Sequence, residues 1–400
     1  MMKALFSIFA VLFLLVVLPF DSWGAVAFGP PGGIEHRSKS VSPPAAAMDD
    51  EGRVYLAWFE EEKDVNSLYL AVSNNNGKTF SQEVRVNGTD DAPASVNDAP
   101  ALSLGSKGEV YLLWSAKGSG NDFASDLRFA RSDDSGKSFS PSVVVNDNAN
   151  PASAGFASIA VGADGAIYIS WLDGRERQTR GTGTYVAYSK DSGRSFGKNV
   201  AVDFDSCPCC RTSIAIGKDN SLYVVWRKVY PGNIREMVIS KSTDEAKSEF
   251  TGPVIVGKDN WEISGCPHRG SSVIAGDNGE VLVSWYAEVD GEPGVFLAAS
   301  KDEKTFLKER IESKRSAFPD NVAAAARGSE LLLAWQEITP VLSNVVFESR
   351  KGADMTRVQL NTDVRKATNP VISVNRKGDV LVAWQKMDMR AAKTMFAIGR

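Results

Sequence analysis

The sequence predicts an all-β protein, a β-propeller of four-stranded blades, and three observations carry this prediction. A phrase ending in tryptophan recurs seven times at nearly constant spacing. Short apolar runs flank each copy, separated by turns rich in Gly and Asp. No sustained helical periodicity follows the first 24 residues. Four short strands in about 50 residues are typical of a propeller blade.

The repeated phrase is a turn, three or four apolar or β-branched residues, and then Trp. It is clear in GRVYLAW at 52–58 and in GEVYLLW at 108–114. The seven tryptophans are spaced by 56, 57, 55, 59, 50 and 49 residues; they are Trp58, Trp114, Trp171, Trp226, Trp285, Trp335 and Trp384. Since each buries roughly 150–250 Å², we expect them in the core between blades and not in a sugar-binding platform.

The two ends of the chain suggest how the ring closes. The seventh unit ends at Arg400 after about three strands, and residues 25–41 precede the first unit without a blade of their own. We expect the N-terminal strand to complete the seventh blade, which removes exposed sheet edges. Six blades, with the sixth or seventh unit packed differently, is the alternative. A chain of 400 residues could hold two or three domains, but the even spacing predicts one propeller over residues 25–400.

Residues 1–24 have the layout of a secretory signal peptide. Lys3 precedes an apolar run over residues 4–20, and small residues follow at Ser22 and Gly24. We expect cleavage after Gly24 or Ala27 and a secreted or periplasmic protein. An uncleaved membrane anchor is the less favoured alternative, because the run is shorter than the about 20 residues that span a bilayer. No other membrane association is expected.

Composition excludes several functions. Forty-five basic and 49 acidic residues give a net charge of −4 without a basic block, so we expect no nucleic-acid partner. The only histidines are His36 and His268, which excludes a three-histidine metal site. We expect His36 at the surface of the closing strand, and we expect a monomer.

A second phrase follows the third strand of several units. It reads SDDSGKSF at 132–139, SKDSGRSF at 189–196 and SNNNGKTF at 73–80, with a shortened form at 300–306 and a degenerate one at 242–250. In such a turn Asp or Asn accepts backbone N–H bonds and Gly permits a positive φ. The structural positions are Asn75, Gly77, Asp134, Gly136, Asp191, Gly193 and Asp302.

These turns resemble the Asp-box, S-x-D-x-G-x-T-W/F, of the sialidase-like (BNR repeat) propeller superfamily, with Phe in place of the commoner Trp. The resemblance covers about residues 40–400. For a sialidase it implies three arginines that grip a carboxylate, a tyrosine nucleophile assisted by a glutamate, and an aspartate as acid/base. The family's arginine motif before the first Asp-box is absent, and the nearest arginine is Arg37. Asp-boxes also occur in non-enzymatic binding propellers, so they indicate the fold more than an activity.

Three residues are candidates for catalysis. Arg211 and Arg269 lie 15 and 16 residues before Trp226 and Trp285, at nearly equivalent places before the innermost strands of adjacent blades. Asp98 lies in the comparable loop of the second blade. We expect all three at the mouth of the central channel. Inter-blade salt bridges for the arginines, and an ordinary turn role for Asp98, are the alternatives.

Other polar residues carry weaker signals. Four follow central strands without a motif that singles one out, namely Tyr185, Tyr230, Tyr286 and Glu236. The charged stretch 173–180 is expected to be either a solvated hairpin or a ligand contact.

All four cysteines lie in two matching loops. Cys207, Cys209 and Cys210 occupy the first, and Cys266 lies with His268 in the second. Repeat register brings both loops to the channel mouth. Two disulfides are one interpretation. Adjacent Cys209 and Cys210 are too close to pair, so one would bridge to Cys266 and the other to Cys207 or stay free. A copper or zinc site made of these thiolates and the imidazole is the second, and a redox-active Cys207–Cys210 pair is the third.

These observations predict an exported, sialidase-like Asp-box propeller. Its function would be to bind a carbohydrate or a protein at the channel-mouth loops of the fourth and fifth blades. A glycoside hydrolase of exo-sialidase type is the alternative. A metal-binding or redox-linked periplasmic protein that uses the Cys/His cluster is the second alternative, and it alone implies copper or zinc.

Overall fold

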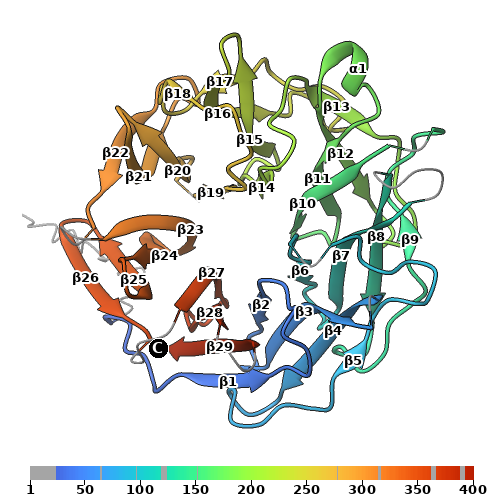
Figure 1. Cartoon of the computed structure of the whole chain (residues 1–400), viewed down its shortest axis with the longest axis vertical. Helices are drawn as coiled ribbons and strands as arrows, with labels where there is room; N and C mark the ends of the chain where they lie inside the picture. Colours follow the sequence, from blue (N-terminus) through green and yellow to red (C-terminus); the bar gives the residue numbers. More distant parts are fainter. Residues whose placement is uncertain are drawn as a thin grey trace, which may run out of the picture.

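Seven antiparallel sheets form a closed ring (Figure 1). The computed structural model describes residues 24–63, 65–95, 97–118, 124–150, 152–276, 278–313, 317–361, 366–387 and 392–400. The predicted seven-bladed propeller is therefore confirmed and the six-blade alternative is wrong. The expected signal peptide lies outside the described residues except for Gly24. No helix among the described residues has the length and apolarity needed to cross a membrane.

The blades follow one another along the chain. Blade 1 is β2 (Ala45–Met48), β3 (Val54–Glu62), β4 (Val65–Ser73) and β5 (Val84–Arg85). Blade 2 is β6 (Ala101–Leu104), β7 (Val110–Lys117), β8 (Ser125–Ser132) and β9 (Val143–Val144). Blade 3 is β10 (Ala154–Val161), β11 (Ile167–Asp173), β12 (Gly183–Ser189) and β13 (Val200–Asp203), with the short helix α1 (Arg177–Arg180) between β11 and β12.

The second half of the ring repeats this order. Blade 4 is β14 (Ser213–Ile216), β15 (Leu222–Tyr230), β16 (Ile234–Lys241) and β17 (Val254–Ile255), with β18 (Trp261–Glu262) also paired to β16. Blade 5 is β19 (Ser271–Ala275), β20 (Val281–Val289), β21 (Glu292–Ser300) and β22 (Leu307–Ile311). Blade 6 is β23 (Phe318–Arg327), β24 (Glu330–Ile338), β25 (Ser343–Lys351) and β26 (Asp354–Gln359). Blade 7 is β27 (Lys366–Val374), β28 (Val380–Met387), β29 (Ala392–Gly399) and β1 (Gly32–Glu35).

The N-terminal strand closes the ring, as predicted. Strand β1 pairs antiparallel with β29, with Ile34 opposite Thr394 (Figure 1). The pairing continues beyond β1, because the N–H of Ala27 donates to the carbonyl of Arg400 at 3.0 Å. The first strands of neighbouring blades contact one another all the way round, including β27 with β2. They therefore line the central channel.

His36, just after β1, departs from its expected place at the surface. Its side chain is buried, its Nε2 lies 3.0 Å from the Thr394 hydroxyl, and its ring packs on Trp58. Burial lowers its pKa to about 4. The surface prediction was wrong because the ring closure, which no local pattern encodes, packs this segment against two blades.

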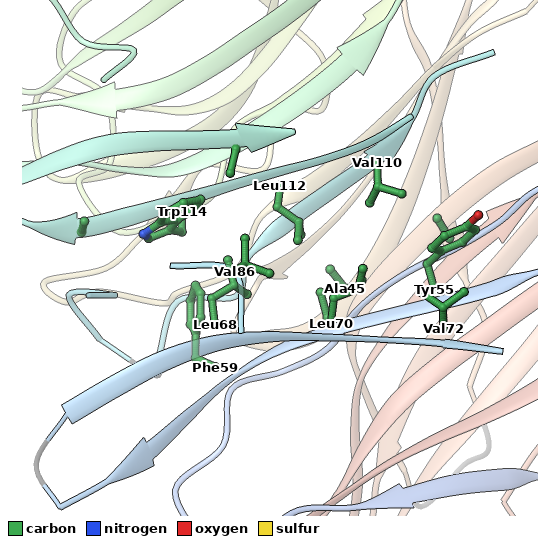
Figure 2. Packing of buried hydrophobic residues seen from close by; sticks show 14 residues of the cluster. Ala45, Tyr55, Phe59, Leu68, Leu70, Val72, Val86, Val110, Leu112 and Trp114 are labelled. Atoms are coloured by element: carbon green, nitrogen blue, oxygen red, sulfur yellow. The ribbon is translucent and has the colours of Figure 1, made fainter. Parts of the chain in front are cut away.

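The tryptophans form the core between blades, as predicted. All seven are at most 2% exposed. Figure 2 shows Trp114 of β7 packed with Phe59 of β3 and Leu68 of β4, so that blade 2 rests on blade 1. At about 25 cal/mol per Å², burying one such ring contributes roughly 4–6 kcal/mol before the cost of chain ordering. The same contact, repeated round the ring, holds the seven sheets together.

The Asp-box turns share one geometry. Asp134 accepts the Ser138 N–H at 2.9 Å and the Ser138 hydroxyl at 2.6 Å, and Asp191 repeats both bonds with its own serine. Asn75 likewise accepts the Thr79 N–H at 2.9 Å, but its side-chain amide donates to the Thr79 hydroxyl at 2.8 Å. In blades 1, 2 and 3 the turn follows the third strand, whose end pairs with the start of the second: Ser189 is opposite Ile167. They therefore lie on the face opposite to the loops that precede the first strands.

Candidate functional site

Equivalent positions of the seven blades meet at the channel mouth. Residues 14 or 15 positions before each repeated Trp all line one cavity of about 260 Å³; they are Pro43, Ala99, Phe156, Arg211, Gly270, Asn321 and Asn369. Asp98, Cys209, His268, Arg269 and Tyr286 line it as well. The repeat register places the predicted loops here, but each blade contributes a different side chain. The mouth is therefore chemically asymmetric.

A larger cavity adjoins this one between blades 2 and 3. Its volume is about 580 Å³, and Asp98 and Phe156 line both cavities. Its walls are mostly small, including Ala94, Ser95, Ser115, Ser125, Ala152, Ser153, Ala154 and Gly155. The rest of the lining is Leu172, Gly174, Arg177, Gln178, Thr182 and Pro208. Together the two cavities form a groove, here called the mouth groove, in the size range of about 300–1,000 Å³ that small-molecule sites occupy.

Arg211 ties three blades together at the mouth. Its guanidinium, from blade 4, pairs with the Asp98 carboxylate of blade 2 and donates to the backbone carbonyl of Ala157 in blade 3. The other Asp98 oxygen accepts the N–H of Phe156 at 3.3 Å. Both oxygens of this carboxylate are thus engaged. The contacts match the inter-blade salt bridge that the sequence left open as an alternative to catalysis.

Arg269 makes a similar link between blades 5 and 6. Its Nε and Nη2 form a two-point ion pair with the buried Asp320 carboxylate, with Nη2 to Oδ2 at 2.7 Å. Its guanidinium carbon lies 6.0 Å from the ring of Tyr286, whose hydroxyl donates to Glu288 at 3.2 Å. Burial raises the pKa of Tyr286, which disfavours the phenolate that a tyrosine nucleophile would need. A substrate carboxylate would compete with Asp320 for Arg269.

Phe156 is a candidate functional residue that belongs to no recognisable sequence motif. Its φ is +53°, in the left-handed region that is unusual for a bulky residue, at a β-bulge between Gly155 and Ser158. Its carbonyl accepts the Thr212 N–H at 3.1 Å, which with Asp98 fixes the bulge from both sides. Phe156 lines both cavities, and its ring centroid lies 6.1 Å from that of His268. Its position 15 residues before Trp171 is the one sequence signal that could have found it.

The charged stretch after β11 is only partly solvated. Asp173 is fully buried and accepts from the Trp171 indole at 2.8 Å and from Arg175 at 2.9 Å. Arg175 also stacks over the Tyr185 ring, 4.3 Å from its centroid. The prediction of a solvated hairpin is therefore wrong for this half. Arg177, in α1, instead lines the larger cavity.

The remaining sequence candidates do not line the mouth groove. Tyr185 is buried and donates its hydroxyl to Glu176 at 2.9 Å. Glu236 is buried and accepts the backbone N–H groups of Asp259 and Asn260 at 2.7 and 2.8 Å, and burial raises its pKa. Tyr230, at the end of β15, is absent from both cavity linings.

The cysteines meet at the edge of the mouth. The Cys207 sulfur lies 3.8 Å from that of Cys209 and 3.4 Å from that of Cys210, and all three side chains are at most 5% exposed. Cys266 is exposed, and all four cysteines are free in this structure. Hydrogen bonds from the neighbouring thiols hold the pKa of Cys210 well below its usual range, and the Arg227 guanidinium adds to this effect. Neither of the disulfides considered from the sequence is formed here.

The comparisons with known proteins support the fold. No protein-family model and no curated protein matches the chain. Among solved structures, a protein of unknown function from Dyadobacter fermentans is 14% identical, with 94% of this chain and 99% of that chain covered and a TM-score of 0.56. A family PL25 ulvan lyase bound to -[GlcA(1-4)Rha3S]- is 13% identical over 92% of this chain and 93% of that chain, at TM-score 0.57.

A third similar structure is the GH93 α-L-arabinofuranosidase of Fusarium graminearum with arabinobiose. It is 12% identical over 93% of this chain and 97% of that chain, at TM-score 0.55. At these identities the similarity shows a shared propeller fold. The named enzymes act on carbohydrate but are not sialidases, so the sialidase-like resemblance rests on the Asp-box turns.

Proposed function

We propose that this chain binds an oligosaccharide in the mouth groove. The observation that carries the proposal is the pair of adjoining cavities, of about 580 and 260 Å³, both lined by Phe156. An aromatic face packs against the C–H face of a sugar ring, while hydroxyl and amide groups exchange hydrogen bonds with its hydroxyls. Ser95, Ser115 and Asn369 supply such groups along the walls.

Two of the similar propellers, the ulvan lyase and the arabinofuranosidase, were solved with saccharides bound. This supports carbohydrate as the ligand class. Their saccharides, -[GlcA(1-4)Rha3S]- and arabinobiose, leave the choice between an acidic and a neutral sugar to the residues of this chain. Arg177 on the larger cavity favours an acidic one, because a guanidinium pairs with a carboxylate or sulfate.

Binding is favoured over hydrolysis. Asp98, the candidate acid, uses one oxygen for Arg211 and the other for the Phe156 N–H. A general acid needs an oxygen within reach of the leaving group. Hydrolysis of a glycoside remains the second proposal because Asp98 lies where the two cavities join, the place where a chain crossing from one to the other would be cut.

The test is calorimetry with ulvan-derived and arabinan-derived oligosaccharides. Phe156→Asn removes the ring but suits the backbone, because Asn321 and Asn369 adopt left-handed φ values of 45° and 53° at matching bulges. We expect the variant to weaken binding about tenfold or more, about 1.4 kcal/mol. Asp134→Asn, on the opposite face, is the matched control and should bind like the native chain.

Failure of every saccharide to bind, or equal weakening by both variants, would overturn the binding proposal. Turnover is measured on the same panel and on fluorogenic glycosides, including a sialoside. Turnover that Asp98→Asn abolishes while saccharide binding persists would favour hydrolysis.

We further propose that the chain is exported and cleaved after Gly24. The Ala27 N–H and carbonyl both bond to Arg400, at 3.0 and 3.2 Å, so cleavage after Ala27 would remove part of the closing strand. N-terminal sequencing of the secreted or periplasmic protein tests this. A mature chain that begins at Ala25 supports it, and one that begins at Phe28 contradicts it.

A further inference from the structure

We propose that Cys207, Cys209 and Cys210 form a buried binding site for a thiophilic cation, Cu(I) or Zn²⁺, which enters through Cys266 and His268. This goes beyond saccharide binding, although Cys209 and His268 also line the smaller cavity of the mouth groove. Thiolate sulfur is the protein ligand that both ions prefer.

The spacing of the three sulfurs fits ligands arranged around one ion. With Zn–S bonds of about 2.3 Å, tetrahedral geometry sets sulfurs about 3.8 Å apart. The sulfurs of Cys207 and Cys209 are 3.8 Å apart, those of Cys207 and Cys210 are 3.4 Å apart, and all three lie within 4.8 Å of one another. A disulfide needs about 2.05 Å. The Cys207 thiol thus lies within hydrogen-bond distance of the other two thiols, and no covalent S–S bond joins the three.

A buried cation on the strand that is hydrogen-bonded to the cysteine loop supplies an independent indication. Arg227 is 1% exposed, and its carbonyl accepts the Cys207 N–H at 2.7 Å, which puts the two residues in contact. Its Nη2 donates to the Tyr286 carbonyl at 2.7 Å, but its Nε and Nη1 have no hydrogen-bond partner among the described residues.

A buried guanidinium without a counter-charge is costly. The Trp261 ring, 5.0 Å away, offsets only part of that cost. Three thiolates around one cation carry a net negative charge that Arg227 would balance. Two disulfides carry no charge, so they would leave the Arg227 guanidinium without a counter-charge. The charge balance therefore favours the metal-thiolate state.

The exposed residues Cys266 and His268 provide an entry route for the ion. Cys209 belongs to a second group of possible ligands, in which its sulfur, the Cys266 sulfur and a His268 ring nitrogen also lie within 4.8 Å of one another. Cys266 and His268 are exposed, and His268 lines the smaller cavity of the mouth groove. An ion captured there needs only to move across Cys209 to reach the buried trio. Each thiol gives its proton to solvent as its sulfur binds, and no electron is transferred.

The two ions make different demands on this arrangement. Cu(I) is satisfied by the three buried thiolates, whereas structural Zn²⁺ takes four ligands and would recruit Cys266 or His268. The double variant Cys266→Ser with His268→Ala therefore distinguishes them. It should leave equilibrium Cu(I) affinity unchanged within a few-fold and sharply weaken Zn²⁺.

The experiment uses the full chain, isolated without reductant from the compartment to which it is exported. Metal content is measured first, together with disulfide mapping on non-reduced peptides. Cu(I) and Zn²⁺ are then titrated into the thiol form against competing chelators. We expect one ion per chain. Cys207→Ser or Cys210→Ser should each weaken binding by more than about 100-fold, because loss of a supporting residue alone costs about 10–100-fold.

Two further variants separate the site from the fold. Arg227→Lys retains the charge and should keep ion affinity within a few-fold, whereas Arg227→Met should lower it. Asp134→Asn, in an Asp-box turn on the opposite face, is the control and should bind the ion normally. Thermal unfolding of each variant shows that it is folded.

Two intact disulfides without an ion in the isolated protein would overturn the proposal. Ion binding that survives Cys207→Ser and Cys210→Ser would overturn it as well. Because the readout is metal and thiol content, its failure is independent of whether a saccharide binds.

Discussion

The two faces of this propeller differ in how closely their residues follow the repeat. On the Asp-box face, blades 1, 2 and 3 present the same turn, and Asn75, Asp134 and Asp191 make the same hydrogen bonds. At the mouth, equivalent positions hold Phe156, Arg211 and Asn369, each with different partners. Repetition marks what every blade needs in order to fold. Departure from the repeat marks where the molecule has acquired chemistry of its own.

The largest expected effect comes from a repeated core position. Trp171→Ala should destabilise the protein by about 3–5 kcal/mol, because it leaves a cavity where a fully buried ring packs. Chemical denaturation measures this. A loss below about 1 kcal/mol would show that the Trp ring is not what joins the blades.

The second effect concerns His36, which has no counterpart in the repeat. Burial lowers its folded-state pKa to about 4 from 6.5. Between these values the unfolded chain binds the extra proton, so stability falls as pH drops from about 6.5 to 4, by on the order of 3 kcal/mol at most. His36→Gln should flatten this part of the profile. Urea unfolding at pH 7 and pH 4.5 measures both chains, and equal acid sensitivity would contradict the assignment.

A smaller effect is expected at the mouth. Arg211→Met removes the charged contacts that join blades 2, 3 and 4, at a cost of about 1.5–3 kcal/mol. Arg211→Lys should recover part of this stability, but its single ammonium group cannot contact both Asp98 and the Ala157 carbonyl as the guanidinium does. Denaturation of the Asp98→Asn and Arg211→Met single and double variants gives the coupling energy. Additive losses would mean that the pair does not act as a unit.

The smallest effect belongs to an Asp-box turn. Asp134→Asn should cost less than about 1 kcal/mol, because the side chain is exposed and blade 1 already uses Asn at this place. Hydrogen bonds, chiefly from the Ser138 hydroxyl, lower the pKa of Asp134 to about 2. Its contribution is present above the unfolded pKa, near 3.9, and is lost as pH falls through about 2. Acid unfolding of the variant should lack this component; a cost like that of Trp171→Ala would make the turn part of the core.

The features that follow from the repeat could be predicted from the sequence. Seven tryptophans at regular intervals and an unfinished last unit predicted seven blades and the closing strand. The same register placed Arg211, Arg269, Asp98 and the cysteine loops at one mouth, because equivalent positions of a ring must face the same axis.

The features that depend on contacts between blades could not be predicted from the sequence. Asp320 as the partner of Arg269 lies 51 residues away, and the two meet only after the ring has closed. Phe156 sits on a bulge that no turn residue signals, and His36 is buried by the closure itself. The cavities, likewise, are the space left by packing and have no sequence signature.

The central claim is that function resides on the mouth face. Amide hydrogen exchange with and without a bound ulvan-derived or arabinan-derived oligosaccharide tests it most directly. Protection is expected in the segments that line the mouth groove, 94–95, 97–99, 152–156 and 268–272, with none in the Asp-box turns 132–139 and 189–196. Protection at the Asp-box turns, or none at the mouth with any saccharide, would contradict it.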